Sequence, residues 1–413
     1  MRQLSVRMYG LPQAVLEQDD SGRMRMTYLP EATRPLSMSL PLRDEPYVHA
    51  SCEAYFGGLL PESDAARRMI ARFYGANANN SFSLLKAIGN DCAGAVSLHL
   101  MDDPVSPSQF LPMEGRPLSE AELAKHLREL PSRPLFLGVE GIRLSLAGAQ
   151  DKAAVCMMDD QLALPLHGTP TTHILKPAVA GFKDMVLNEY LCLKLAQEVG
   201  LEVPAVEMRK AEDIPYLLVE RYDRVVDPEH RLSRVHQEDF CQALGASSAM
   251  KYEADGGPGV AQCFGLVRRT SRPAVSIKRL LEHLLFNVLV GNCDAHAKNY
   301  SLLHREDGRI DLAPAYDVVC TRYYPDIEAR MAMKIGGYYR SEELIARRWR
   351  RFCDEVDVSF PMLRRTLTGM NEAIQTAIER VIAVADWEGS GEILGFIAAH
   401  AASVVNRLEQ SET

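Results

Sequence analysis

The fold of this chain is decided by the stretch Asn292-Cys293-Asp294-Ala295-His296-Ala297-Lys298-Asn299, with Ala315-Tyr316-Asp317 a short loop later. A phosphoryl-transfer site needs one carboxylate beside the acceptor hydroxyl, and amide and carboxylate oxygens that hold Mg²⁺ against the nucleotide phosphates. Asp294 fits the first role, and Asn299 with Asp317 fit the second. The same spacing also occurs as a capping or turn pattern. The interpretation therefore depends on finding the other parts of a kinase in the right order.

The pattern of apolar residues predicts where the helices and strands lie. Residues 1 to about 30 indicate a small antiparallel meander, and 103–118, rich in Pro and Gly, indicates a linker or exposed loop. Strands are expected at 173–176 and 216–220 around a helix at 188–199. The remaining helices are expected at 277–290, which ends at Gly291 just before the polar stretch, and at 342–356, 361–384 and 391–409.

Strand, helix and strand before a helix-rich half match a two-lobed protein kinase. We therefore predict an α+β fold, with a mixed N-terminal lobe that includes a small β-rich subdomain, and an all-helical C-terminal lobe. The predicted domains are 1–110 for the β-rich subdomain, 111–224 for the kinase N-lobe and 225–413 for the helical C-lobe.

Composition excludes several classes of protein. The 413 residues are 47% hydrophobic and 24% charged, which is typical of a globular protein. The net charge of −9 argues against nonspecific nucleic-acid binding by the whole surface. The local basic run 347–351 is interpreted as a solvated helix face. Nine dispersed cysteines without metal-ligand spacing indicate reduced core thiols, and no apolar run has the length of a membrane span, so a soluble, cytoplasmic protein is expected.

Three upstream segments complete the set of kinase parts. The small residues of 144–152 would let backbone N–H groups approach phosphate oxygens, with Lys152 adding charge, although a plain strand-turn-strand fits too. Lys176 in an apolar strand would need an anionic partner, with Glu189 one candidate, or it would lie on an edge strand and point to water. Residues 220–224 follow an apolar strand as a hinge would, or form a charged turn. Only their order favours the kinase interpretation.

At this point the sequence resembles the HipA-type serine/threonine kinases, the toxin half of bacterial toxin–antitoxin pairs. The segments that carry the resemblance are Ser145-Leu146-Ala147-Gly148-Ala149-Gln150-Asp151-Lys152, Thr171-Thr172-His173-Ile174-Leu175-Lys176, Val219-Glu220-Arg221-Tyr222-Asp223-Arg224, 237–242, 251–259 and Asp294-Ala295-His296-Ala297-Lys298-Asn299. The N-terminal part is similar at 59–63 and 94–96. The resemblance covers nearly the whole chain, with 331–337 and the C-terminal helices matching less clearly.

The resemblance implies a role for each matching position. Asp294 would be the catalytic carboxylate, Asn299 and Asp317 the Mg²⁺ ligands, and Ser145 the autophosphorylated serine. Without the resemblance, Ser145 is read as a turn cap. The residues implied to contact ATP are Ala147, Gly148, Ala149, Gln150, Asp151, Lys152, Lys176, Glu220, Arg221, Tyr222, His296, Ala297, Lys298, Asn299, Tyr316 and Asp317.

The leading functional hypothesis is a protein kinase that transfers the ATP γ-phosphate to a serine. The resemblance implies an aminoacyl-tRNA synthetase as target, so that translation and growth are inhibited. It also implies a HipB-like helix-turn-helix antitoxin as partner, with DNA contacted mainly through the antitoxin complex. The alternatives are a small-molecule kinase of similar fold, and a catalytically silent scaffold that binds an antitoxin and DNA.

Overall fold

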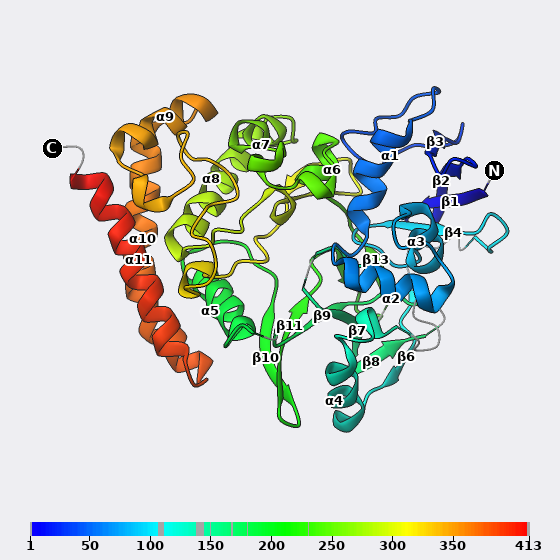
Figure 1. Cartoon of the computed structure of the whole chain (residues 1–413), viewed down its shortest axis with the longest axis horizontal. Helices are drawn as coiled ribbons and strands as arrows, with labels where there is room; N and C mark the ends of the chain where they lie inside the picture. The colour runs from blue at the N-terminus through cyan, green and yellow to red at the C-terminus, as the bar shows by residue number, and fades with distance from the viewer. Residues whose placement is uncertain are drawn as a thin grey trace. The chain divides into compact units, whose positions relative to one another are not determined.

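The computed structural model of the chain is drawn in Figure 1 and describes residues 2–105, 111–137, 144–148, 150–166, 168–179, 181–229 and 231–410. These residues form two compact units. Unit 1 comprises 1–177, 207–249 and 303–308, and unit 2 comprises 178–206, 250–302 and 309–413. The chain thus enters each unit more than once, whereas the sequence analysis divided it into three contiguous stretches. The three-domain division remains a prediction.

The N-terminal part of unit 1 is built on a four-stranded antiparallel sheet. Its strands are β1 (Arg2–Met8), β2 (Leu11–Gln18), β3 (Met24–Tyr28) and β4 (Val96–His99), in the order β3-β2-β1-β4. This confirms the predicted meander of the first 30 residues. The helices that follow β3 are α1 (His49–Phe56), α2 (Asp64–Tyr74) and α3 (Ser81–Ile88). Ser63 caps α2 by accepting the N–H of Ala66, and Asn80 caps α3 in the same way.

A six-stranded sheet forms the second part of unit 1. Its order is β10-β11-β9-β7-β8-β6. The strands are β6 (Gly115–Pro117), β7 (Ala153–Met158), β8 (Gln161–Pro165), β9 (His173–Pro177), β10 (Val206–Ala211) and β11 (Ile214–Glu220). Helix α4 (Glu120–Glu129) begins at a capping box of Ser119 and Glu122. The predicted strands at 173–176 and 216–220 are confirmed.

The expectation of a linker or exposed loop at 103–118 is wrong for its second half. Leu111–Pro112 form β5, and Gly115–Pro117 form β6, which pairs with β8. Proline and glycine are tolerated in this strand because it lies at the edge of the sheet. β5 belongs to a small sheet with β12 (Arg224–Val226) and β13 (Arg231–Arg234). Strand β14 (His236–Asp239) and helix α6 (Phe240–Leu244) follow.

Unit 2 consists mainly of helices. They are α5 (Met185–Glu198), α7 (Val260–Val267), α8 (Pro273–Val290), α9 (Ala346–Val356), α10 (Phe360–Ala385) and α11 (Ser390–Gln410). Each of these except α7 lies at a predicted position. The long helices α10 and α11 lie side by side (Figure 1). The prediction of an all-helical C-terminal lobe is wrong in one respect, because β16 (Ile310–Leu312) and the first two residues of β15 (Ser301–His304) also lie in this unit.

The cysteines of the chain are part of its hydrophobic cores. All nine cysteines are buried and free, as predicted. Burial raises the pKa of most of these thiols, for example that of Cys263 to about 12, so they pack as small apolar side chains. Within the described part of the chain, every helix falls short of the length and apolar character that a membrane crossing needs.

Candidate active site

The loop after α8 in unit 2 is held in place by hydrogen bonds to α8, to Thr321 and within the loop itself. Helix α8 ends at Gly291, whose φ of +76° favours glycine. Asn292 then accepts the N–H of Asp294 on its Oδ1 (3.0 Å) and donates Nδ2 to the side chain of Asn287 (2.7 Å). The N–H of Cys293 donates to Thr321 Oγ1 (2.8 Å). The buried helix therefore fixes the loop while the carboxylate of Asp294 remains exposed.

Asp294 is surrounded by donors from its own loop and from one distant residue. Its carbonyl oxygen accepts the N–H of His296 (2.8 Å) and Nδ2 of Asn299 (3.0 Å). Its carboxylate Oδ1 accepts the hydroxyl of Tyr252 (2.7 Å), whose ring lies edge-on to His296 with 5.2 Å between ring centroids. The sequence analysis assigned no role to Tyr252. Its only signal was its place in the family-like segment 251–259.

Asp317 lies in the same loop system. Its carbonyl oxygen accepts Asn292 Nδ2 (3.4 Å), so one asparagine contacts both aspartates of the predicted site. Asp317 has a φ of +53°, a left-handed conformation that costs a non-glycine residue on the order of 1 kcal/mol. Backbone strain of this kind is typical of functional sites. The hydroxyl of the preceding Tyr316 donates to the carbonyl of Lys298 (2.8 Å), which ties the two segments together again.

The predicted metal ligands have the right donor chemistry for a hard cation. Asn299 uses its Nδ2 on the Asp294 carbonyl, which leaves the amide oxygen as the ligand atom, and Asp317 supplies a carboxylate. Mg²⁺ prefers oxygen donors and is commonly held by one or two side chains together with substrate phosphates. No group of three or more His, Cys, Asp or Glu side chains suited to a metal occurs among the described residues. The residues therefore fit Mg²⁺ held jointly with phosphates rather than a closed protein cage.

His296, Ala297 and Lys298 of the predicted ATP-contacting set are buried in the loop. Ala297 to Asn299 form a short 3₁₀ turn. The N–H of Asn299 donates to the His296 carbonyl of the same loop (2.9 Å). Side chains of His296 and Lys298 are 4% and 7% exposed. These residues support the loop from within, so any contact with a ligand would come from a small part of their surface.

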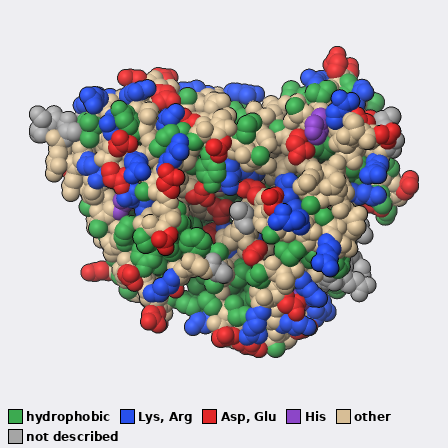
Figure 2. Space-filling model, in the orientation of Figure 1, with side chains coloured by type: hydrophobic (Ala, Val, Ile, Leu, Met, Phe, Trp, Pro, Cys, Tyr) green, Lys and Arg blue, Asp and Glu red, His purple; other side chains and the backbone are tan. Residues whose placement is uncertain are grey.

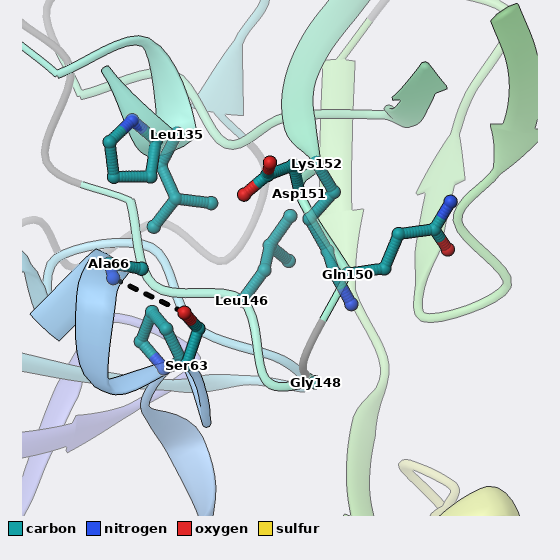
Figure 3. Close-up of a pocket in the computed structure, with 10 residues that line it drawn as sticks. Ser63, Ala66, Leu135, Leu146, Gly148, Gln150, Asp151 and Lys152 are labelled. Carbon is teal, nitrogen blue, oxygen red and sulfur yellow. Dashed lines mark hydrogen bonds between the residues drawn. The ribbon is translucent and has the colours of Figure 1, made fainter. Parts of the chain in front are cut away.

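The described residues of the small-residue segment of unit 1 lie beside a pocket (Figure 3). The residues lining this pocket are Pro61, Ser63, Ala66, Pro134, Leu135, Leu146, Gly148, Gln150, Asp151 and Lys152. Lys152 Nζ donates to the Ala147 carbonyl (2.7 Å), so the lysine closes the turn. Gly148 has a φ of +105°, and a Cβ there would lie 2.4 Å from Lys152 Nζ. Burial raises the pKa of Asp151.

This geometry explains why small residues are needed in the turn. The lysine amine can reach the carbonyl only because Gly148 lacks a side chain, and the Gly148 carbonyl in turn accepts the N–H of Glu62 (3.1 Å). The predicted ATP contact at Ala149 lies outside the described residues.

Ser145, at the start of this segment, is fully buried. Its Oγ donates to the Leu59 carbonyl (2.7 Å), and its N–H donates to the Asp91 carbonyl (2.9 Å). The serine therefore joins two backbone segments of the N-terminal part and does not cap a turn.

Lys176 is a buried lysine in the middle of the six-stranded sheet. Its strand β9 is paired with β11 on one side and β7 on the other, and the lysine is 6% exposed. The alternative of an edge-strand lysine pointing to water is therefore wrong. Burying an ammonium group requires compensating polar partners. Glu189, the candidate partner named from the sequence, is buried on α5 of unit 2.

The predicted hinge at 220–224 contains a feature that the sequence did not reveal. Glu220 is exposed at the end of β11, whereas Arg221 is 4% exposed. The Arg221 side chain donates to Asp223 (2.8 and 3.0 Å) and to Thr171 Oγ1 (2.8 Å). The full set of charged residues in this cluster, hereafter the buried arginine–aspartate network, is Asp91, Arg221, Asp223, Arg224 and Arg234.

This network means that segment 220–224 stabilises unit 1 through buried ion pairs, in addition to connecting its neighbours along the chain. Asp91 lies 2.9 Å from Arg224 and 2.7 Å from Arg234. Burial alone would raise the pKa of Asp223, but the guanidinium groups of Arg221 and Arg224 lower it to about 2. A charged turn was the alternative to a hinge, and the charges are in fact buried. The Arg221 side chain is therefore committed to the network, and its N–H donates to the Thr172 carbonyl (2.9 Å).

Comparison with known proteins gives the family. The HipA-like C-terminal domain matches residues 144–386, and the HipA N-terminal domain matches 4–99. This chain belongs to the HipA family of serine/threonine kinases. Both family domains are present, and the first includes every site residue discussed above that lies beyond residue 143.

Individual HipA relatives match over most of their length. The protein named "Putative kinase Y4mE" of Sinorhizobium fredii is 44% identical over 354 residues, which cover 85% of this chain and 84% of the relative. "Serine/threonine-protein kinase toxin HipA" of Shewanella oneidensis is 31% identical over 361 residues, which cover 84% and 81%. A structure of the Shewanella oneidensis HipA, HipB and operator DNA complex superposes with a TM-score of 0.83 at 27% identity, covering 99% of this chain and 97% of that one. The α+β kinase-like fold predicted from sequence is thereby confirmed.

Proposed function

We propose that this HipA-type kinase transfers the γ-phosphate of ATP to a serine hydroxyl of a protein, with Mg²⁺ as the metal. The observation that carries the proposal is the loop in which Asn292 links Asp294 to Asp317 and Asn299 holds the Asp294 backbone. This loop system presents the exposed carboxylate of Asp294, together with two further oxygen ligands from Asn299 and Asp317. A scaffold without catalytic activity has no physical need for this arrangement.

Each residue of the loop has a distinct task in this proposal. Asp294 would orient the acceptor hydroxyl and accept its proton as the oxygen attacks phosphorus. Tyr252, through its 2.7 Å hydrogen bond, would keep the carboxylate in one orientation. Asn299 and Asp317 would hold Mg²⁺, which neutralises the charge on the transferred group.

Unit 1 supplies groups that suit a nucleotide. The turn at Ala147 and Gly148, closed by Lys152, offers backbone donors and one ammonium group, and buried Lys176 offers a second. Gln150, Asp151, Glu220 and Tyr222 remain predicted contacts of ATP. For Arg221 we propose a contact through its carbonyl oxygen, which accepts the Arg224 N–H (3.1 Å) and has a second lone pair. The Arg221 side chain is committed to the buried arginine–aspartate network, and its N–H donates to the Thr172 carbonyl.

Ser145 is the proposed site of autophosphorylation and a site of control. Its hydroxyl donates to the Leu59 carbonyl and is buried, so the segment must leave this position before the hydroxyl can receive a phosphate. A phosphoserine carries a charge of about −2, which would prevent its return to a site designed for a neutral donor. The modification would thus rearrange the turn formed by Gly148 and Lys152 and oppose ATP binding.

The wider role follows from the family. We propose that the chain is a toxin that inhibits translation and growth, that an aminoacyl-tRNA synthetase is its target, and that a HipB-like antitoxin neutralises it. The structure of a relative bound to HipB and operator DNA supports a DNA contact made mainly through the antitoxin. A small-molecule kinase is the second candidate, since such enzymes also use a set of Asp, Asn and Asp.

The test is phosphate transfer by the purified chain. After incubation with Mg²⁺ and ATP, the intact mass should increase by one phosphate, and peptide mapping should place it on Ser145. The Asp294→Ala variant should show no increase, whereas Asp326→Asn, which alters an exposed aspartate of the same unit, should behave as the wild type. Absence of any increase, in protein shown to be unphosphorylated at the start, would contradict autophosphorylation and leave the small-molecule kinase as the better proposal.

A further inference from the structure

A hairpin formed by residues 330–340 of unit 2 is hydrogen-bonded to the catalytic loop. It reverses direction at Gly336 and Gly337, which have φ values of +56° and +91°, and the N–H of Ile335 donates to the Tyr338 carbonyl (2.9 Å). The N–H of Ala332 donates to the carbonyl of Cys293 (2.8 Å), the residue immediately before Asp294. The hairpin is therefore part of the surface next to the proposed phosphoacceptor site.

Four cationic side chains surround this hairpin. Two of them lie over Tyr339, with the Arg330 guanidinium 4.2 Å and Lys334 Nζ 5.1 Å from the ring centroid. Arg348 of α9 lies over the ring of Tyr338 at 3.4 Å. Arg351, one turn further along α9, lies so close to Gly337 that a Cβ there would be 2.9 Å from its Nη1. We refer to residues 330–340 together with Arg348 and Arg351 as the cationic hairpin.

The charge of this region is the opposite of that of the whole chain. Residues 330–351 contain two acidic side chains, Glu342 and Glu343, and seven basic ones, Arg330, Lys334, Arg340, Arg347, Arg348, Arg350 and Arg351. Lysine and arginine side chains, with some acidic ones between them, gather over α9 (Figure 2). The net charge of the chain is −9, so this concentration of positive charge is local. The sequence analysis interpreted 347–351 as a solvated face, whereas Arg348 and Arg351 contact the hairpin.

One dipeptide connects the cationic hairpin to the catalytic carboxylate. Tyr252 donates its hydroxyl to Asp294, and the next residue, Glu253, accepts the backbone N–H of Lys334 (2.6 Å). The Glu253 carboxylate also lies 3.5 Å from Lys334 Nζ. Glu343 pairs with Arg348 (3.6 Å) in a similar way, while Arg330 and Arg351 are exposed. Hydrogen bonds and ion pairs therefore fix the hairpin at Lys334 and hold Arg348 beside it, while Arg330 and Arg351 keep their guanidinium groups at the surface.

We propose that the cationic hairpin binds an acidic segment of the protein substrate, and so selects serines flanked by aspartate or glutamate. This inference rests on the proposed kinase function and deepens it by naming the chemistry of the substrate segment. Guanidinium groups bind carboxylates in a fixed, two-pronged geometry, and stacking on tyrosine rings orients them before the substrate arrives.

An acidic peptide fits this surface better than a single-stranded nucleic acid. Proteins that bind single strands offer aromatic faces on which bases stack. Here the rings of Tyr338 and Tyr339 already have arginine and lysine side chains lying over them. The surface therefore offers cations rather than stacking platforms, and its hydrogen bond to the Cys293 carbonyl joins it to the loop where the acceptor hydroxyl must bind.

The test measures the binding of defined probes to the full chain. Labelled serine peptides of equal length, with acidic, neutral or basic flanking residues, and a single-stranded RNA oligonucleotide are titrated by fluorescence anisotropy. The variant is Arg330→Glu with Arg351→Glu, and Arg25→Glu on β3, an exposed arginine of unit 1, is the matched control. Should charge reversal unfold the protein, Arg330→Gln with Arg351→Gln is used instead. Autophosphorylation is measured by intact mass on every sample.

We expect the acidic peptide to bind at least about tenfold more tightly than the neutral one, and the double variant to lose that advantage while Arg25→Glu keeps it. The affinity should also fall as salt is added. Equal affinities for the three peptides, or no binding of any probe, would overturn the proposal. Tighter binding of the RNA than of the acidic peptide, abolished by the same variant, would overturn it in favour of a nucleic-acid surface. The mass measurement reports kinase activity separately, so a failure there counts against the proposed function alone.

Discussion

Asp91 and Asp223 of unit 1 lie buried against three arginines, whereas Asp294 of unit 2 is exposed and accepts a hydrogen bond from a tyrosine. Both groups are carboxylates with well-defined partners. In the first, Asp91 joins distant segments by contacting Thr171, Arg221, Arg224 and Arg234. Asp223 pairs with Arg221 and Arg224 of its own segment. In the second, the backbone is fixed while the carboxylate faces solvent.

The difference separates two uses of charge in one chain. A buried ion is stable only with all its partners present, and the loss of one partner leaves an uncompensated charge in a medium that solvates it poorly. Such a network can specify how segments join but cannot exchange its ligands. An exposed carboxylate with a fixed backbone has the opposite properties, since it can approach a substrate without disturbing the core. The four predictions below test that separation.

The largest expected effect is on activity, at the exposed carboxylate. Asp294→Asn retains the shape of the side chain and removes its ability to accept a proton. We expect the rate of phosphate transfer to fall by about 10³-fold, measured as single-turnover incorporation of labelled phosphate. The thermal midpoint should stay within about 1 °C of the wild type, because an exposed residue without buried contacts contributes little to stability. A large fall in thermal midpoint would show that Asp294 belongs with the structural carboxylates.

The second effect is on stability, at the buried network. Asp91→Asn leaves Arg221, Arg224 and Arg234 with a single carboxylate between them. Breaking a buried ion cluster in this way costs about 3–5 kcal/mol of unfolding free energy, measured by chemical denaturation. The control is Asp44→Asn, an exposed aspartate of unit 1 that should change the free energy by less than about 0.5 kcal/mol. A loss as small as that of the control would mean that the network contributes specificity rather than stability.

The sequence predicted elements that depend on local pattern. The apolar run before Gly291 is helix α8, and the short apolar pattern of 173–176 is strand β9, because both predictions depend on neighbouring residues only. The candidate catalytic loop was found for the same reason, since Asp294 and Asn299 lie five positions apart in one turn. Whether the loop is catalytic remains a prediction that the geometry supports.

The sequence could not predict features that depend on distant pairing. β6 was taken for a loop because its proline and glycine signal a break, and only its pairing with β8 makes it a strand. Arg221 looked like part of a polar connector because its partner Asp91 lies 130 positions earlier. The contact of Tyr252 with Asp294 could not be predicted for the same reason, as it spans 42 positions. Long-range hydrogen bonds leave no periodic trace in a single sequence.

The third effect is the pH dependence of stability. The buried arginine–aspartate network should not contribute to it at mild acidity, so the comparison between the two groups of carboxylates becomes sharper. Burial lowers the pKa of His236 and of His283 to about 3. An unfolded histidine has a pKa of about 6.5, so between these values the unfolded chain binds more protons and stability falls as the pH falls. Each of these histidines should lower the unfolding free energy at pH 5 by about 2 kcal/mol relative to pH 7. Asp223, with a pKa of about 2, is still ionised there and contributes to the loss only at lower pH.

Chemical denaturation between pH 7 and pH 5 tests this assignment. Burial also lowers the pKa of His99, His173 and His400 to about 4, so these histidines contribute to the same fall in unfolding free energy. His283→Gln replaces one of the five side chains by an amide and should remove about a fifth of the fall, whereas Asp44→Asn should leave the slope unchanged. An unchanged slope in His283→Gln would mean that other groups dominate the acid sensitivity of the fold.

The smallest expected effect is at Tyr252, a supporting residue that contacts the exposed carboxylate directly. Tyr252→Phe removes the hydrogen bond to Asp294 Oδ1 and leaves the ring that contacts His296. The carboxylate then samples several orientations, so we expect kcat to fall about tenfold while KM for ATP is unchanged, because the hydroxyl that is removed donates to the proposed base. Tyr323→Phe, which removes a hydroxyl elsewhere in unit 2, is the control. If KM for ATP and thermal stability changed together in Tyr252→Phe, the tyrosine would have to be grouped with the structural contacts rather than with the catalytic loop.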